Sequence, residues 1–164
     1  MAKPIVLVGP MGVGKTTIGK KLAKKLDLPF IDTDKDIVKS HGPIPKIFET
    51  MGELHFRQLE TDSLARALAT NSVVATGGGV VTQEANRSLL RDHLVIYLST
   101  SGKHISSRLV LGKRPLLKNG FADWKRIYEE RKPLYSSVAT REISTSDKSL
   151  NEVISEIENL VSNV

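Results

Sequence analysis

Short apolar runs alternate along this chain with amphipathic stretches of helical spacing. Ile5-Val6-Leu7-Val8 is the first run, and after it Ile18, Leu22 and Leu26 recur every four residues with lysines between them. A short continuous apolar run is typical of a strand buried on both faces, and the spacing of four is typical of one helix face. The alternation predicts an α/β fold built on a parallel sheet.

The same pattern predicts five strands and eight helices. We expect strands at residues 5–8, 29–32, 73–76, 94–98 and 141–144. We expect helices at residues 15–26, 35–40, 45–49, 52–70, 83–91, 102–111, 122–132 and 149–161. No repeat or linker interrupts them, so all of residues 1–164 are expected to form a single domain. In open sheets of this kind ligands gather beyond the C-terminal ends of the strands.

Composition narrows the class of protein. Hydrophobic residues make up 40% and charged residues 26% of the 164, which are values of a globular domain. The absence of cysteine excludes disulfides and thiolate metal sites. No run is long enough to span a membrane, and the first strand leaves no room for a leader peptide, so we expect a cytoplasmic protein with no membrane partner.

The net charge of +6 and a pI near 9.6 raise the question of nucleic-acid binding. The lysines after the first strand fall on the polar side of a helix, where a solvated surface explains them. Aromatic residues are only 5% and do not alternate with basic clusters as a base-stacking platform would require. We therefore expect no nucleic-acid partner. No apolar stripe remains for a second subunit, so we expect a monomer.

The turn after the first strand carries the most specific motif in the chain. Residues 9–16, Gly-Pro-Met-Gly-Val-Gly-Lys-Thr, fit G-x-x-x-x-G-K-[ST], the P-loop that cradles nucleotide phosphates. Its glycines bring backbone N–H groups to the phosphates, and the helix N-terminus adds a favourable field. Lys15 is expected to reach the β- and γ-phosphates, and the Thr16 hydroxyl to bind Mg²⁺. The residues expected to bind ATP here are Gly12, Val13, Gly14, Lys15, Thr16 and Thr17.

Two acids follow the second strand in Phe30-Ile31-Asp32-Thr33-Asp34. Alternation places Asp32 and Asp34 on the same side of an extended backbone, which suits one acid to the metal and the other to a substrate hydroxyl. The alternative is that Asp34 caps a helix that begins near Lys35. The third strand ends in no acid, so Asp32 is the leading candidate for the Mg²⁺ environment.

Two further segments carry candidate substrate contacts. Glu53, Arg57 and Glu60 have the spacing of an ordinary ion-pair ladder on a helix surface, which by itself explains all three. By contrast, the third strand is followed by Gly77-Gly78-Gly79. Three glycines have no side chains to pack and weaken local order, so this run indicates that a ligand lies directly against the backbone.

Basic residues gather in the last third of the chain. Residues 111–120 hold two lysines and Arg114 between glycines, which suggests a mobile lid over the phosphates; a plain polar loop is the alternative. In Arg131-Lys132-Pro133-Leu134-Tyr135 the proline is expected to end a helix and leave Arg131 in its last turn, where it could be only a partner of the helix dipole.

Taken in order, these motifs resemble those of shikimate kinase over nearly the whole chain. The resemblance rests on the P-loop, F-x-D-x-D, G-E-x-x-F-R-x-x-E, T-G-G-G, R-P-L and R-x-P-L-Y. It implies a three-layer P-loop fold with a central five-stranded parallel sheet, helices on both sides and a lid. It also implies ATP-dependent phosphorylation of the 3-hydroxyl of shikimate, with Mg²⁺, in the route to aromatic amino acids.

The resemblance also assigns roles to individual residues, with the substrate region at residues 33–61. Arg57 and Arg131 match the arginines that hold the substrate carboxylate, and Asp34 matches the acid at its hydroxyls. The shikimate site is completed by the backbone of Gly77, Gly78 and Gly79. Asp32 matches the acid near Mg²⁺, Arg114 the lid arginine at the phosphates, and Arg108 the arginine that stacks on adenine. Lys15, Asp34 and Arg114 are the expected catalytic residues.

Two alternatives remain at this point. Another small-molecule kinase of the same architecture, such as a gluconate kinase, would also need arginines and an aspartate; T-G-G-G together with F-x-D-x-D favours the shikimate pattern. A nucleotide-dependent switch without a small acceptor would not need Asp34, Arg57 and Arg131 to converge.

Overall fold

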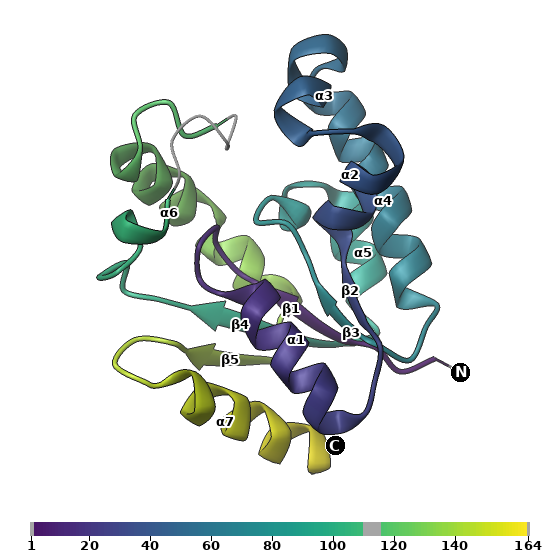
Figure 1. Cartoon of the computed structure of the whole chain (residues 1–164), viewed down its shortest axis with the longest axis vertical. Coiled ribbons are helices and arrows are strands. Elements are labelled where there is room, and N and C mark those ends of the chain that lie inside the picture. Colours follow the sequence, from purple (N-terminus) through teal and green to yellow (C-terminus); the bar gives the residue numbers. More distant parts are fainter. Residues whose placement is uncertain (1, 110–115, 164) are drawn as a thin grey trace.

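The computed structural model describes residues 2–109 and 116–163, and five parallel strands form one sheet within them (Figure 1). The strand order is β2-β3-β1-β4-β5, with β1 in the centre and its four residues buried. The strands are β1 (Ile5–Val8), β2 (Phe30–Asp32), β3 (Val73–Ala75), β4 (Leu94–Ser99) and β5 (Arg141–Ser144). The predicted five-stranded parallel sheet is confirmed.

Helices cover both faces of this sheet (Figure 1). Side chains alternate along β1, so Leu7 packs toward α1 and α7 while Val6 packs toward α4, α5 and α6. The helices are α1 (Lys15–Leu26), α2 (Thr33–His41), α3 (Ile44–Met51), α4 (Glu53–Leu68), α5 (Glu84–Leu90), α6 (Phe121–Val138) and α7 (Leu150–Ser162). Two short 3₁₀ segments, η1 (Val80–Thr82) and η2 (Ser106–Arg108), follow β3 and β4.

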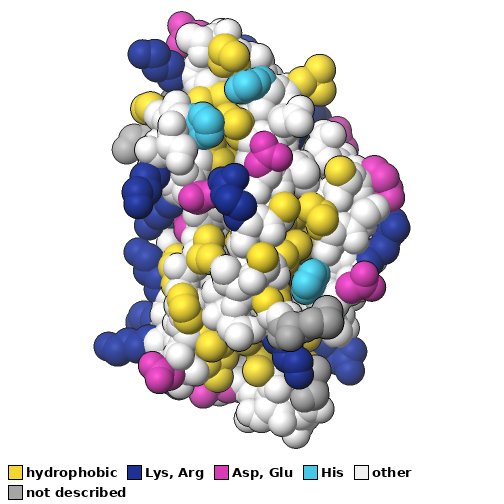
Figure 2. All heavy atoms as spheres, turned by 90° about the vertical axis from the view of Figure 1, so that its right-hand side faces the viewer, with side chains coloured by type: hydrophobic (Ala, Val, Ile, Leu, Met, Phe, Trp, Pro, Cys, Tyr) yellow, Lys and Arg dark blue, Asp and Glu magenta, His cyan; other side chains and the backbone are white. Residues whose placement is uncertain are grey.

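Helices α2 and α3 pack against each other and against α4 beside the β2 edge of the sheet (Figure 1). Ile37, Ile47 and Phe56, one from each helix, make a small apolar cluster of their own. In Figure 2 hydrophobic side chains are visible at the upper end of the molecule, and Met51 and Leu54 at the α3–α4 corner are exposed. Basic side chains gather along one edge of that face. This group of helices forms one wall of the site described below.

One predicted helix is wrong. Residues 102–109 form a loop that contains only the short η2 segment, and residues 110 and 111 lie outside the described part. Gly102 has a φ of +88°, and hydroxyls bind the backbone locally: Ser107 Oγ donates to the His104 carbonyl, and Ser101 Oγ accepts from Lys103 N. Such bonds compete with a helical ladder, and the segment is held to the core by buried Ile105 and partly buried Leu109.

Helix α6 is longer than predicted, because it continues through Pro133 to Val138. A proline inside a helix removes one backbone hydrogen bond and crowds the preceding turn. Burial on the far side of the proline outweighs that cost, since Tyr135 and Val138 are almost completely buried against the sheet. Arg131 therefore lies in the middle of the helix, and its interpretation as a partner of the helix C-terminus is wrong.

The start of α2 also differs from the prediction. The helix begins at Thr33, so Asp34 is in its first turn and does not alternate with Asp32 along a strand. Asp32 is the N-cap: its Oδ1 accepts from Lys35 N at 3.1 Å. The alternative in which Asp34 caps this helix is therefore wrong.

Among the described residues no helix is long and apolar enough to cross a membrane.

Candidate active site

The phosphate loop joins β1 to α1 in a backbone conformation that needs glycine. Gly9, Gly12 and Gly14 have φ values of +152°, +80° and +106°, which other residues rarely adopt. Lys15 is the first residue of α1, and its Nζ lies across the loop, where it donates to the carbonyls of Gly9 (2.6 Å) and Pro10 (2.9 Å). The loop and the helix N-terminus thus present a cation and backbone N–H groups to one anion site.

Thr16 and Asp32 bring two oxygen ligands together at the edge of this loop. Thr16 Oγ1 donates to Asp32 Oδ2 at 2.7 Å, although the two residues are 16 positions apart in the sequence. Hydroxyl and carboxylate oxygens suit Mg²⁺, which commonly uses one or two protein ligands and completes its shell with water and phosphate. Correspondingly, no cluster of three or more His, Cys, Asp or Glu side chains with metal-site geometry occurs in the described residues. The pair fits the predicted metal environment.

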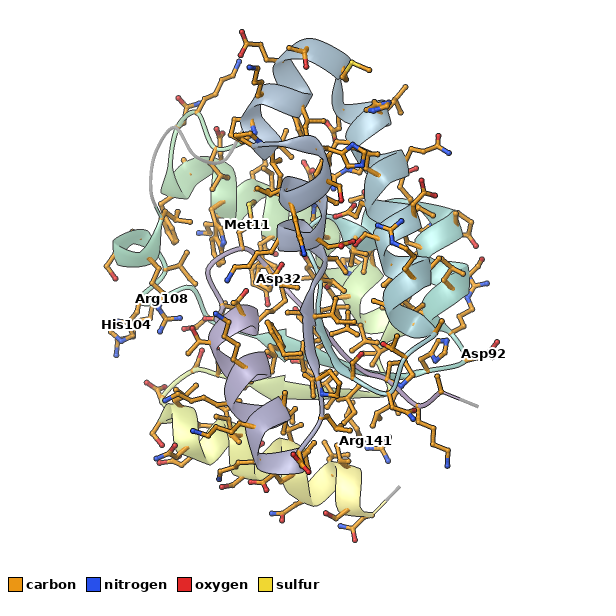
Figure 3. The ribbon with its side chains drawn as sticks, turned by 45° about the vertical axis from the view of Figure 1, so that its right-hand side comes forward. Met11, Asp32, Asp92, His104, Arg108 and Arg141 are labelled. Carbon is orange, nitrogen blue, oxygen red and sulfur yellow. The ribbon has the colours of Figure 1, made fainter. Side chains whose placement is uncertain are left out.

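Arg108 lies on the other side of the phosphate loop. Its Nη1 donates to the Gly12 carbonyl at 3.1 Å. Its side chain borders two cavities. The first, called the phosphate cavity below, is lined by the phosphate loop, Thr16 and Asp32, and the second is lined by Thr17, Thr145 and Lys148. In Figure 3 Met11, Asp32 and Arg108 surround the N-terminal end of α1, whereas Asp92 and Arg141 lie far from it. This position is compatible with the predicted adenine contact.

Helix α4 supplies a buried ion pair. Arg57 Nη1 donates to Glu60 Oε1 at 2.9 Å, and Arg57 Nη2 donates to Glu53 Oε2 at 3.2 Å. Arg57 and Glu60 are 5% and 0% exposed, whereas the Glu53 side chain is half exposed. An ordinary surface ladder is therefore the wrong interpretation of this motif, since two of its three members are in the interior.

The glycine turn after β3 lets these side chains approach the backbone. A Cβ at Gly79 would lie 2.6 Å from Arg57 Nη2, and one at Gly77 would lie 2.7 Å from Asp34 Oδ1 and 2.8 Å from Glu60 Oε2. Real Cβ contacts are longer than this, so side chains at these positions would displace the charged groups. The glycines leave room both for a ligand and for the groups around it.

Helix α6 closes the opposite side. Arg131 is 8% exposed, and its Nη1 would lie 3.7 Å from a Cβ at Gly78. One turn later, the Tyr135 hydroxyl donates to the Gly78 carbonyl, and burial raises the pKa of this tyrosine so that it remains a donor. Trp124, on the same helix, donates from Nε1 to the Met11 carbonyl at 2.7 Å. The helix is thus bonded to both the glycine turn and the phosphate loop.

All the predicted substrate residues that the structure describes border one cavity. Its polar lining consists of Asp34, Arg57, Glu60, the turn 77–79 and Arg131. Its apolar lining consists of Met11, Ile44, Phe48, Phe56 and Leu116. The phosphate cavity beside it shares Met11, Asp34, Gly77 and Gly78 with this lining, so Asp34 stands where the two spaces meet.

Glu60 has an unusual environment for a carboxyl group. Burial raises its pKa from 4.5 to about 7; the nearby Arg57 opposes this rise and the carboxylate of Asp34 adds to it. Its Oε2 has no hydrogen-bond partner among the described residues. A carboxyl group of this kind, in a cavity lined by arginines, is typical of a functional site.

Sequence reasoning missed several parts of this cavity. Glu60 was recognised only as a member of a ladder, yet it lies on the same helical stripe as Phe56, Leu64 and Ala67, all buried. That spacing is a readable signal that Glu60 faces inward. The contribution of Tyr135 depends on a hydrogen bond to a residue 57 positions away, which no local pattern reveals. Arg114 and most of the predicted lid, residues 111–115, lie outside the described residues.

The known proteins that this chain resembles most clearly are shikimate kinases. A sequence profile described as shikimate kinase matches residues 11–162. A shikimate kinase of Salinispora arenicola is 42% identical over 161 residues, covering 96% of each chain. A solved structure of shikimate kinase from Acinetobacter baumannii in complex with shikimate has a TM-score of 0.93 and 37% identity, covering 99% of this chain and 94% of that one. A gluconokinase from Sinorhizobium meliloti, at 18% identity and a TM-score of 0.63, covering 98% of this chain and 94% of its own, shares the fold alone.

Proposed function

The chain belongs to the shikimate kinase family, and we propose that it transfers the γ-phosphoryl group of ATP to the 3-hydroxyl of shikimate. The observation that carries this proposal is the position of Asp34 between the phosphate cavity and a second cavity with two buried arginines. A small acid with several hydroxyls needs such cations for its carboxylate and such an acceptor for the hydroxyl that reacts.

Each residue has a physical task in this reaction. Arg57 and Arg131 hold the carboxylate from opposite sides of the glycine turn, and Asp34 accepts the hydrogen bond of the attacking hydroxyl, which directs its oxygen to the γ-phosphorus. Lys15 moves from the loop carbonyls to the β- and γ-phosphates and stabilises the charge that spreads over them. The hydroxyl proton leaves through Asp34 as the oxygen–phosphorus bond forms and ADP departs.

Mg²⁺ would be held by Thr16, with Asp32 beside it, and would neutralise charge on the phosphate oxygens. Arg108 and the hollow at Thr17, Thr145 and Lys148 are assigned to the adenine and ribose side of ATP. Arg114 keeps the role that the resemblance gives it, as an arginine at the transferred phosphoryl group.

Initial-rate kinetics of Arg131→Ala test the substrate assignment. Loss of one buried, charge-assisted contact should raise the KM for shikimate at least tenfold and change the KM for ATP less than twofold. Arg126→Ala is the matched control, since Arg126 lies on the same helix but is exposed and paired with Asp123 and Glu130. An unchanged KM for shikimate in Arg131→Ala would contradict the assignment.

A further inference from the structure

The cation expected to hold the substrate carboxylate already holds a buried carboxylate of the protein. Glu60 is fully buried, and its Oε1 accepts from Arg57 Nη1 at 2.9 Å. Its other oxygen, Oε2, faces the glycine turn, within 2.8 Å of the point that a Cβ would occupy at Gly77. A substrate anion at Arg57 would therefore enter next to an existing anion. This inference rests on the proposed function, because it takes the ligand of Arg57 to be the carboxylate of shikimate.

Carboxylates already stand beside both arginines of the cavity before the substrate binds. The ionisable groups that face it among the described residues are Arg57 on its own helix, Asp34 on α2, and Arg131 and Tyr135 on α6. The turn at residues 77–79 contributes no ionisable side chain. Among the described residues that line the cavity, two guanidinium groups thus stand beside the carboxylates of Asp34 and Glu60, with the tyrosine neutral, and Arg57 also holds the half-exposed Glu53. The substrate carboxylate would add a further anion to these groups.

An uncompensated charge in such a place is strongly unfavourable, and a proton is the smallest group that removes it. Glu60 is the side chain suited to receive it. Burial already brings the pKa of Glu60 to about 7, and Arg57 is the largest influence that opposes this rise. A substrate carboxylate at Arg57 would share this guanidinium with Glu60 and would add a negative charge close to it. Both effects disfavour the ionised form of Glu60 and raise its pKa further.

We propose that Glu60 takes up one proton from solvent when the shikimate carboxylate binds at Arg57, and returns it to solvent when that carboxylate leaves. The proton is added to Oε2, the oxygen without a hydrogen-bond partner, while Oε1 remains the acceptor of Arg57. Shikimate binding is thereby coupled to proton uptake. Its affinity falls as the pH rises above about 7, by up to tenfold for each further pH unit.

Isothermal titration calorimetry measures this proton directly. Shikimate is titrated into the whole protein at pH 8 without nucleotide, once in HEPES and once in Tris, whose enthalpies of ionisation differ widely. The difference between the two binding enthalpies gives the number of protons taken up, which we expect to lie between about 0.5 and 1 per shikimate.

Two matched variants assign the proton to one residue. Glu60→Gln keeps an oxygen acceptor for Arg57 but has no group to protonate, so its binding enthalpy should be the same in both buffers. Glu53→Gln makes the same chemical change at the half-exposed partner of Arg57 and should keep the proton uptake of the unmodified protein. Should Glu60→Gln not fold, the dissociation constant of the unmodified protein from pH 7 to 9 provides the second measurement.

Equal enthalpies in the two buffers for the unmodified protein would overturn the inference, as would full proton uptake by Glu60→Gln or an affinity that does not change from pH 7 to 9. Shikimate would still bind in each of these cases, so the proposed function would stand. Absence of any shikimate binding would instead overturn the proposed function, and this inference with it.

Discussion

At the scale of single residues, the site depends on how closely charged side chains approach a bare backbone. The three glycines after β3 lie against Asp34, Glu60, Arg57 and Arg131. Gly79 has φ −96° and ψ 7°, which any residue can adopt, so its special requirement is space and not conformation.

Gly79→Ala should therefore damage the site without straining the backbone. Its Cβ would displace the Arg57 guanidinium, which is buried and held by two carboxylates, and the KM for shikimate should rise at least tenfold while the KM for ATP stays within about twofold. Steady-state kinetics with each substrate varied in turn, after a thermal melt to establish folding, measure this. Gly78→Ala is the comparison: its Cβ would lie 3.1 Å from Met11 Cγ and 3.3 Å from Met11 N, contacts longer than those at Gly79, so its effect should be smaller. Equal KM values for the Gly79 variant and the unmodified protein would contradict the role of that contact.

For single residues, the sequence predicted neighbours along the chain better than burial. Asp34 lines the cavity beside the phosphate loop, but its predicted local geometry was wrong, since it lies in the first turn of a helix and not on an extended strand. The ion pair of Arg57 and Glu60 was visible in the spacing, but its burial was not. Spacing describes neighbours on one helix, whereas burial depends on what α2, α6 and the glycine turn bring against that helix.

At the scale of elements, most helix and strand boundaries could be predicted from the sequence, because the hydrophobic periodicity and the capping residues indicate the same ends. Helix α1 was predicted at its observed bounds, and α7 begins after Ser149, whose Oγ accepts from Glu152 N as an N-cap. The failures occur where tertiary packing overrides a local signal. Pro133 is a strong helix breaker, but Tyr135 and Val138 beyond it are buried, so the helix continues.

Pro133→Ala tests that explanation. Pro133 is exposed, and alanine would restore a backbone donor and relieve the crowding in the preceding turn, so the free energy of unfolding should rise by about 2 kcal/mol. Urea denaturation followed by circular dichroism measures it. Ser136→Ala, at another exposed position of α6, should change stability by no more than about 0.5 kcal/mol. A destabilised Pro133→Ala protein would mean that the proline itself supports the helix.

At the scale of the whole molecule, the buried carboxyl group of Glu60 links the site to stability. Its pKa is raised from 4.5 to about 7 on folding, so the folded state binds this proton more tightly than the unfolded chain. The stabilisation is complete below pH 4.5 and is lost as the pH rises through 7. The rise in pKa corresponds to about 3 kcal/mol.

Glu60→Gln should therefore gain stability relative to the unmodified protein as the pH rises. The difference in free energy of unfolding between this variant and the unmodified protein should shift in favour of the variant by up to about 3 kcal/mol between pH 4 and pH 8. Denaturant unfolding at several pH values measures the difference. Glu53→Gln, at the half-exposed partner of Arg57, should show a much smaller change over the same range. A difference for Glu60→Gln that does not vary with pH would contradict the assigned environment.

The central claim is that the oxygen at carbon 3 of shikimate receives the phosphoryl group. The most direct measurement is a two-dimensional proton–phosphorus NMR correlation of the product formed from shikimate, ATP and Mg²⁺ by this protein. We predict a phosphate monoester whose phosphorus couples to the ring proton at carbon 3, with ADP formed in equal amount. A mixture without phosphorylated shikimate, or a coupling to the proton at carbon 4 or 5, would contradict the account.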